Sequence, residues 1–437
     1  MTDDVRDNTW TTLPNLRSSR ITGFHKLPLV DRVALVAAWA ALSPHEQAML
    51  TYEGLSLERA DQMIENVIGL YALPLGVATN FQINGQDYLI PMVVEEPSVV
   101  AACSNAARLV REGGGFHTSS DEPLMIGQIQ ILDVDNVYAA AGRVWEQREA
   151  LIEAANDSTS SIVRRGGGVR DLELHPLMQT SAGPMLIVHI VMDTRDAMGA
   201  NAVNSVCEQL GPRIAQITGG RVLLRILSNL TDRRRAQASC RVPAAALGGP
   251  AVGRGIVEAA AFAEADPYRA ATHNKGVMNG MDAVCIATGN DWRALEAGAH
   301  AYAGLHGRYT SMTRWWQDDF GDLHGSIDIP LAVGTVSGAT RSHPGAQVAM
   351  KILGNPDARP LAEIIAAVGL AQNLAALRAL ATEGIQRGHM EMHARQLALA
   401  AGAPPDLIPE VVAVMIQENR IRLERAKVLV EEMLGRP

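Results

Sequence analysis

The chain has 437 residues, 47% of them hydrophobic, a length and composition that suit two or three domains with a sizeable core. Its formal net charge of -9, without a long basic run, argues against nucleic-acid binding, so small molecules are the expected partners. The first residues lack the apolar core of a signal peptide and no later run reaches the length of a membrane span, which predicts a cytoplasmic protein without a membrane partner. The four cysteines form no CxxC pair and indicate neither a zinc site nor a disulfide framework.

The first part of the chain predicts helices followed by a hairpin that ends in two acids. A helix is expected over about 30–42, and the Asn-Gly pair at 84–85 is typical of a hairpin turn. The second strand of the hairpin leads to Glu95 and Glu96, just before a helix that begins near Ser98. A carboxyl group shielded from water at this point can act as a proton donor, although two surface acids in a strand-to-helix turn fit the same pattern.

From about residue 121, strand-like runs alternate with helical stretches, which predicts an inserted α+β domain. Glycines at 113–115 and the polar stretch 228–236 mark its two ends. Within it, the sequence DAMGAN follows a strand and opens a helix, so its free N–H groups can bind a pyrophosphate. No GxGxxG motif follows a first strand, so a Rossmann fold is not indicated. The GGG at 166–168 is interpreted as a turn before a strand.

The stretch 266–300 contains a cluster of polar residues among glycines and alanines. The cluster consists of Arg269, His273, Lys275, Asn279 and Asp291. A lysine in such packing loses part of its hydration, and Asp291 would keep Lys275 charged, which suits it to stabilise an oxyanion. The alternative is a solvated loop with an ordinary surface lysine.

Near the C-terminus, His389 and His393 lie four residues apart, on one face of an expected helix. The glutamate between them does not follow the first histidine as in HExxH, so we predict no zinc site there; an exposed histidine pair fits equally well. The tail predicts one amphipathic helix with Val414, Ile421 and Val428 on its apolar face. We expect this region to act as a mobile flap that covers the site.

Several motifs together resemble one family. THNKG at 272–276, with the later NG and ATGND, resembles the active-site segment of 3-hydroxy-3-methylglutaryl-coenzyme A reductases. Further matches follow the order of that family: ENVIG at 65–69, the hairpin and helix at 80–102, DTRDAMGANAVN at 193–204, RILSNL at 225–230 and the stretch 369–395. The variant that they resemble is the soluble bacterial class, called class II or degradative.

This resemblance implies an α+β fold with a large, mostly helical substrate domain. It also implies an inserted small α+β cofactor domain of ferredoxin-like, non-Rossmann type, and a C-terminal helical flap. The implied boundaries are 1–120 and 230–386 for the large domain, 121–229 for the cofactor domain and 387–437 for the flap. A homodimer or larger homo-oligomer, with the site at the subunit interface, is expected as well.

The implied activity is that of an oxidoreductase that interconverts 3-hydroxy-3-methylglutaryl-CoA and mevalonate plus coenzyme A by two hydride transfers, without a metal. Lys275 would stabilise the oxyanion, Asp291 would position Lys275, and Glu96 would supply a proton. His389 would protonate the departing thiolate. The implied substrate contacts are Arg269, Ser98, Asn279, Glu65 and Arg17, and Asn279 would also support the network of Lys275 and Glu96 by hydrogen bonds. The implied cofactor contacts are Asp196, Met198, Gly199, Asn201, Asn229 and Asp157.

The cofactor choice depends on the stretch before the GGG turn. Members that use NAD carry an acid there, and an ungapped alignment places Thr159 at that position, two residues from Asp157. Asp157 would bind the ribose hydroxyls, whereas Arg164 and Arg165 could pair with a 2′-phosphate. The sequence thus favours NADH and leaves NADPH possible. The alternative function is a non-catalytic acyl-CoA-binding or scaffold protein with the same fold; an unrelated dehydrogenase would need a parallel βαβ core, which the sequence does not indicate.

Overall fold

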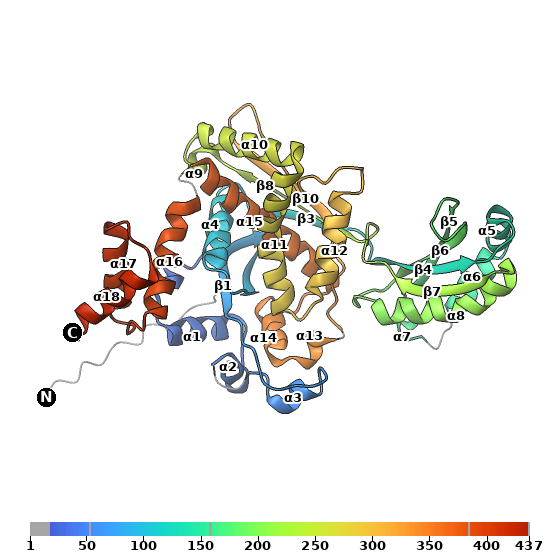
Figure 1. Ribbon diagram of the computed structural model, residues 1–437, viewed down its shortest axis with the longest axis horizontal. Coiled ribbons are helices and arrows are strands. Elements are labelled where there is room, and N and C mark those ends of the chain that lie inside the picture. Colours follow the sequence, from blue (N-terminus) through green and yellow to red (C-terminus); the bar gives the residue numbers. More distant parts are fainter. Residues whose placement is uncertain (1–17, 52–53, 157–159, 337, 383–384, 436–437) are drawn as a thin grey trace.

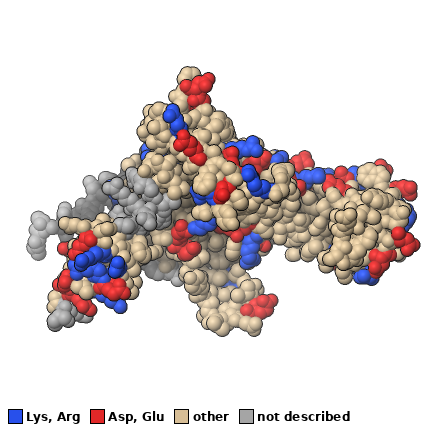
Figure 2. All heavy atoms as spheres, turned by 45° about the horizontal axis from the view of Figure 1, so that its top comes forward, with Lys and Arg blue, Asp and Glu red and all other residues tan. Residues whose placement is uncertain are grey.

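The computed structural model describes residues 18–51, 54–156, 160–336, 338–382 and 385–435, the last range without the side chains of 385–392. Figure 1 shows a central body, a smaller body of strands and helices on one side of it, and a group of C-terminal helices on the other side. Each of the three has its own cluster of buried hydrophobic side chains. Figure 2 shows positive and negative side chains interspersed over the face that it displays.

The central body is built on a six-stranded sheet with the order β2-β1-β3-β8-β10-β9. Its strands are β1 (Leu75–Ile83), β2 (Gln86–Val93), β3 (Phe116–Ser120), β8 (Arg235–Val242), β9 (Thr313–Gln317) and β10 (Leu323–Pro330). The predicted hairpin is confirmed: β1 and β2 pair antiparallel, and Asn84 and Gly85 between them have φ values of 49° and 80°, as a two-residue turn of this kind requires. The hairpin carries the chain to Glu96.

Helices cover this sheet. They are η1 (Phe24–Lys26), α1 (Leu29–Trp39), α2 (Pro44–Thr51), α3 (Leu57–Asp61), α4 (Val99–Arg111), α9 (Ala244–Leu247), α10 (Pro250–Ala265), α11 (Pro267–Ala287), α12 (Trp292–Ala303), α13 (Ala339–Ser342), α14 (Pro344–Ile352) and α15 (Ala358–Ala381). Helix α15 packs against α4, α10 and α11 in the middle of the body.

Helix α15 corrects one expectation. With 24 residues, it is long and apolar enough to cross a membrane by length and composition, whereas the sequence had been expected to contain no such run. Its most apolar window is 67% buried inside the central body. Because its side chains pack on all sides, α15 is the core helix of this body rather than a segment with a free apolar surface.

The smaller body is a four-stranded sheet with helices on one face. Its elements are β4 (Leu124–Leu132), α5 (Val137–Glu146), α6 (Arg148–Ala155), α7 (Ser161–Arg164), β5 (Gly168–Leu177), β6 (Met185–Asp193), α8 (Ala200–Thr218) and β7 (Arg221–Leu227). The strand order is β5-β6-β4-β7, and all neighbouring strands are antiparallel. This β-α-β-β-α-β arrangement is the ferredoxin-like one, which confirms the predicted non-Rossmann α+β fold.

The C-terminal group consists of α16 (Ile385–Ala400), α17 (Ile408–Gln417) and α18 (Leu423–Met433). The prediction of one amphipathic helix is therefore wrong. Asn419, with φ of 51°, ends α17, because its N–H bonds to the Ile416 carbonyl while the Arg420 N–H bonds to that of Met415. This is a Schellman ending with asparagine where glycine is commoner. The predicted domain boundaries separate the three hydrophobic clusters except at Ala332, which belongs to the cluster of the smaller body; as limits of independent domains they stay predictions.

Candidate active site

The end of the hairpin and the start of α4 place Glu96 and Ser98 at the edge of a cavity. Ser98 precedes α4 with φ of 74°, and its side chain makes no capping hydrogen bond to the helix. A left-handed conformation is uncommon for serine. The hydroxyl is thus left free of the usual capping role, and Ser98 lines a cavity of 550 Å³ together with Glu96.

Helix α11 brings two further polar side chains to Glu96. Lys275 and Asn279 lie four residues apart and share one face of the helix. The Nζ atom of Lys275 lies 2.5 Å from Oε2 of Glu96, and Nδ2 of Asn279 lies 3.4 Å from the same oxygen. The structure therefore brings together three of the predicted site residues around one carboxylate oxygen.

The lysine is more open to solvent than the sequence suggested. Its side chain is 60% exposed, so the expectation of a lysine dried by close apolar packing does not hold for this structure. The small residues beside it serve another purpose. A Cβ atom on Gly280 would lie 2.9 Å from the Cβ of Gln372, so this glycine lets α11 approach α15 closely.

Two residues before Lys275, His273 belongs to a buried polar network that also borders the smaller cavity. Nε2 of His273 lies 2.7 Å from Oγ1 of Thr313, 2.8 Å from Oγ of Ser311 and 3.1 Å from Nδ2 of Asn373. Burial, followed by the charge of Arg269, lowers the pKa of His273 to about 4, so the imidazole is neutral. His273 thus belongs to the structural core of the helix packing.

Two cavities meet at the Glu96 pair. Glu96 and Asn279 line both the 550 Å³ cavity and a larger one of 1110 Å³. Lys275 and Arg269 line the smaller cavity, and burial lowers the pKa of Arg269. The carboxylate and the amide are therefore accessible from both sides.

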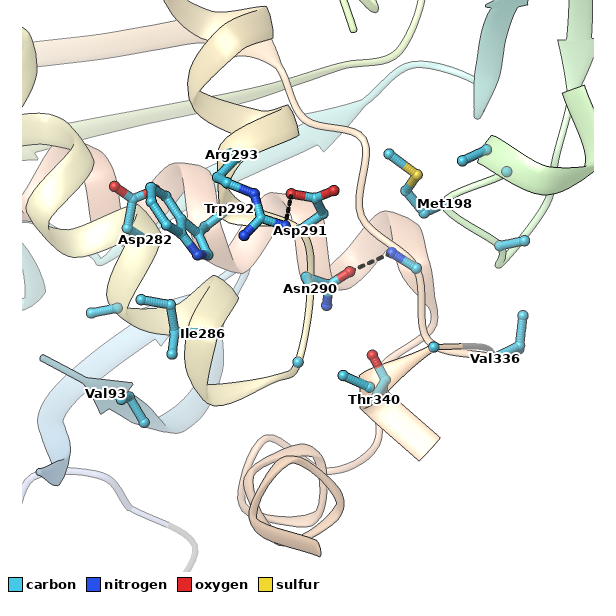
Figure 3. Close-up of a pocket in the computed structure, with 18 of the residues that line it drawn as sticks. Val93, Met198, Asp282, Ile286, Asn290, Asp291, Trp292, Arg293, Val336 and Thr340 are labelled. Atoms are coloured by element: carbon cyan, nitrogen blue, oxygen red, sulfur yellow. Dashed lines mark hydrogen bonds and ion pairs between the residues drawn. The ribbon is translucent and has the colours of Figure 1, made fainter. Parts of the chain in front are cut away.

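The larger cavity contains the DAMGAN turn between β6 and α8. Met198, Gly199 and Asn201 line it, and Figure 3 shows Met198 across the cavity from Val93 and Ile286. Gly199 precedes α8 with φ of 102°, and a Cβ atom there would lie 2.5 Å from the Thr194 side chain. Since no side chain caps the helix, its first N–H groups remain available to an anion, as the sequence predicted.

Two other predicted cofactor contacts lie elsewhere. Oδ1 of Asp196 accepts a hydrogen bond from the backbone N–H of Ala358 at 3.1 Å, so this carboxylate caps the start of α15. Asn229 is exposed, and its backbone oxygen lies against Gly298, where a Cβ atom would come within 2.5 Å. Neither residue is in the wall of the two cavities as the described residues form them.

Asp291 lines the larger cavity at the start of α12, but it does not approach Lys275. Its Oδ1 accepts a hydrogen bond from the Ala294 N–H at 3.1 Å and lies 3.7 Å from Nη2 of Arg293 (Figure 3). Lys275 is paired with Glu96 instead. The expected positioning of Lys275 by Asp291 is therefore not what the structure shows, because the two side chains belong to different cavities.

Sequence analysis did not single out two residues that shape the larger cavity. Arg234 is buried and holds the DAMGAN turn in place, donating to the carbonyls of Ala197 and Met198 at 3.1 and 3.3 Å. Asp282 lines the cavity, and burial, followed by the charge of Glu296, raises its pKa to about 8. The run of three arginines at 233–235 was the only sequence signal for Arg234, and it does not tell which arginine is buried.

The remaining predicted residues lie outside this region or outside the described structure. Arg17 and Asp157 are not among the described residues, and the side chain of His389 is not described, although its backbone belongs to α16. Glu65 is exposed in the segment that follows α3 and lines neither cavity.

Comparison with known proteins identifies the class. The model of the family described as hydroxymethylglutaryl-coenzyme A reductase matches residues 29–394, and the chain belongs to this family. The 3-hydroxy-3-methylglutaryl-coenzyme A reductase of Archaeoglobus fulgidus is 54% identical over 416 residues, 95% of either chain. The probable reductase of Borreliella burgdorferi is 36% identical over 346 residues, 77% of either chain.

Solved structures place the chain within the family. A reductase of this name from Streptococcus pneumoniae has a TM-score of 0.81 and 42% identity, covering 94% of this chain and 99% of that one. A second structure from the same organism, described as the class II enzyme bound to NADPH in open conformations, has a TM-score of 0.79 and 42% identity and covers 93% and 100%. The predicted relation to the class II reductases is thus confirmed.

Proposed function

We propose that this chain interconverts 3-hydroxy-3-methylglutaryl-CoA and mevalonate plus coenzyme A. The observation that carries the proposal is the group of Lys275, Glu96 and Asn279 at the meeting point of two cavities, one with an open helix N-terminus and the other with a half-buried arginine. A cofactor in the larger cavity and an acyl substrate in the smaller would meet at this group. The names of the relatives support the same reaction.

The chain's own residues have distinct parts in this reaction. The ammonium group of Lys275 stabilises the oxygen of the thioester, and later of the aldehyde, as negative charge develops on it. Glu96, already hydrogen-bonded to Lys275, supplies a proton to that oxygen when the aldehyde is reduced. Arg269 faces the smaller cavity and suits the free carboxylate of the substrate. His389 protonates the coenzyme A thiolate, as the family resemblance implies.

A nicotinamide dinucleotide suits the larger cavity. Its volume of 1110 Å³, the uncapped N-terminus of α8 and the missing side chain at Gly199 leave room for a pyrophosphate close to backbone N–H groups. Each reduced cofactor molecule would supply one hydride, so two molecules would bind in turn during the overall reduction.

The NADH preference expected from Asp157 depends on a residue outside the described structure, whereas Arg165 lines the larger cavity. We therefore infer that Arg165 favours NADPH by pairing with the 2′-phosphate. The related class II enzyme from Streptococcus pneumoniae that is bound to NADPH supports this choice.

We also propose that the protein is a homodimer or larger homo-oligomer in the cytoplasm. The segment after α3, which includes Glu65, exposes Ile68 at 103% and Tyr71 at 91% of their full accessibility. Apolar side chains exposed in a row are typical of an interface, and a second copy of the chain would cover them.

A spectrophotometric assay tests the proposed reaction. The purified chain is mixed with mevalonate, coenzyme A and oxidised cofactor, and absorbance at the reduced-nicotinamide band is followed. We expect a rise that requires coenzyme A. A non-catalytic scaffold would give no rise, and an unrelated hydroxy-acid dehydrogenase would give one without coenzyme A; either result would contradict the proposal.

A further inference from the structure

A second group of polar side chains lies on the small sheet, away from both cavities. Glu173 and His175 are two residues apart on β5 and therefore point to the same face. His189 on β6 is the direct antiparallel partner of Glu173, so it joins them on that face. The other face carries the hydrophobic cluster beneath α5, α6 and α8.

The three side chains bring potential ligand atoms close together. One ligand atom from each of Glu173, His175 and His189 lies within 4.8 Å of the other two. The two imidazole rings are 4.0 Å apart between centroids and tilted by 39°. The pairing of β5 with β6 places the three side chains next to one another. Strands also hold side chains more rigidly than loops do, so the distances between the ligand atoms are well defined.

Part of the hydrogen-bonding capacity in this group is unused. Nε2 of His175 is buried and has no hydrogen-bond partner among the described residues, and it lies 3.6 Å from Oε2 of Glu173. Oδ1 of the neighbouring Asp232 is likewise buried without a partner. The imidazole nitrogen and the carboxylate oxygen therefore face each other at a distance that one cation could bridge.

The surroundings favour imidazole in its metal-binding form. Nε2 of His189 lies 2.9 Å from the amide nitrogen of Gln128, its cross-strand partner on β4. Because the amide nitrogen donates this hydrogen bond, Nε2 is the unprotonated nitrogen of the ring, and an incoming zinc ion would replace the amide there.

We propose that Glu173, His175 and His189 form a zinc site. Two imidazole nitrogens and one carboxylate oxygen are a ligand set that zinc accepts, with a fourth position left for water. These residues line neither of the two cavities, so the site is separate from the proposed reaction.

Arg233 competes with the metal for Glu173. Its Nη2 atom lies 2.9 Å from Oε1 of Glu173, and its side chain is 48% exposed, so the guanidinium group can turn into solvent when a cation binds. Removing this positive charge lowers the repulsion that an incoming zinc ion meets. The site therefore predicts opposite effects for two substitutions: loss of a ligand weakens zinc binding, and loss of Arg233 strengthens it.

Titration calorimetry of the untagged full-length chain with zinc chloride tests the proposal. We expect one zinc ion per chain, binding weakened about tenfold or more in His189→Gln, tighter binding in Arg233→Gln, and no change in the control His306→Gln, whose side chain is exposed elsewhere. No zinc binding, equal binding in His189→Gln, or weaker binding in Arg233→Gln would overturn it. Because Arg233→Gln keeps all three ligands, it tests the site even where His189→Gln unfolds. Reductase activity is measured on the same samples, so failure of the zinc site and failure of the proposed reaction are told apart.

Discussion

Polar residues on two sides of α11 have different roles, one structural and one in the candidate site. On one side, His273 and Asn274 are buried, and His273 is fixed by Thr313 and Asn373. On the other side, Lys275 and Asn279 contact a single carboxylate and are more exposed than His273, although all three border the smaller cavity. His273 is 2% exposed and serves the fold through the three contacts of its Nε2 atom, whereas the side chain of Lys275 is 60% exposed beside Glu96 and is available to a ligand.

This difference is invisible in the residue types. His273 and Lys275 are two positions apart in a cluster that the sequence singled out as a whole, and helical geometry alone sends them to different sides. We therefore predict that substitutions at the partly exposed Lys275 and Asn279 change activity, and that those in the buried network of His273 change stability.

The largest expected effect is that of Lys275→Ala. Loss of an oxyanion donor costs about 3–4 kcal/mol in the reaction barrier, so kcat should fall by a factor of about 10² to 10³. The free energy of unfolding should change by less than about 0.5 kcal/mol, since the side chain is 60% exposed. Steady-state rates and urea unfolding measure both. Lys351→Ala is the matched control, because Lys351 forms a similar pair with Glu46 outside the two cavities. Near-normal turnover of the Lys275 variant would remove this residue from the mechanism.

Asn373→Ala tests the buried side. Oδ1 of Asn373 accepts hydrogen bonds from Oγ1 of Thr313 at 2.9 Å and from Nε1 of Trp315 at 2.8 Å. Leaving these buried donors unpaired should lower the free energy of unfolding by about 2–3 kcal/mol. Asn279→Ala on the cavity side serves as its counterpart and should lower activity with little effect on unfolding. Equal stability of the two variants would contradict the division of the helix into two sides.

The contribution of Asp282, also on α11, to stability is expected to depend on pH. Its pKa is raised to about 8 by burial and then by Glu296, so the folded chain binds this proton more tightly than the unfolded chain. The resulting stability is complete below about pH 4 and is lost as the pH rises through about 8. Asp282→Asn should thus gain in stability relative to the parent between pH 5 and pH 9, as measured by thermal unfolding across that range. The exposed Asp319 supplies the control, Asp319→Asn. A pH-independent difference for Asp282→Asn would count against the raised pKa.

The smallest effect is expected at Arg165. An ion pair between an exposed arginine and a 2′-phosphate contributes about 0.4–1 kcal/mol, so Arg165→Ala should lower kcat/KM for NADPH about two- to fivefold and leave the value for NADH unchanged. The neighbouring Arg164 is not in the cavity wall, which makes Arg164→Ala the control. Equal losses with both cofactors would show that Arg165 does not recognise the phosphate.

Local features of the fold were predictable from the sequence. The Asn-Gly turn, the DAMGAN helix start and the alternation of strands and helices in the small body depend on neighbouring residues, and each was predicted. The long helix α11 was not, because Gly276 and Gly280 disfavour a helix; packing against α15 overrides that preference.

Partners distant in the sequence were harder to predict. The network of Glu96, Lys275 and Asn279 was expected from the family resemblance alone, because it depends on how the hairpin meets α11. For the same reason, the capping role of Asp196 and the burial of Arg234 could not be foreseen. Residue type predicts which interactions a side chain is able to form, and tertiary packing decides which partner it forms them with.

A double-mutant cycle on kcat tests most directly whether the cavity side of α11 acts as one unit with Glu96. Turnover is measured for the parent, Lys275→Met, Glu96→Gln and the double variant. Because the two groups share one hydrogen bond and act on the same substrate oxygen, the double variant should be about as slow as the slower single variant. If instead the two losses multiply, Lys275 and Glu96 act independently, and the central claim about this site is contradicted.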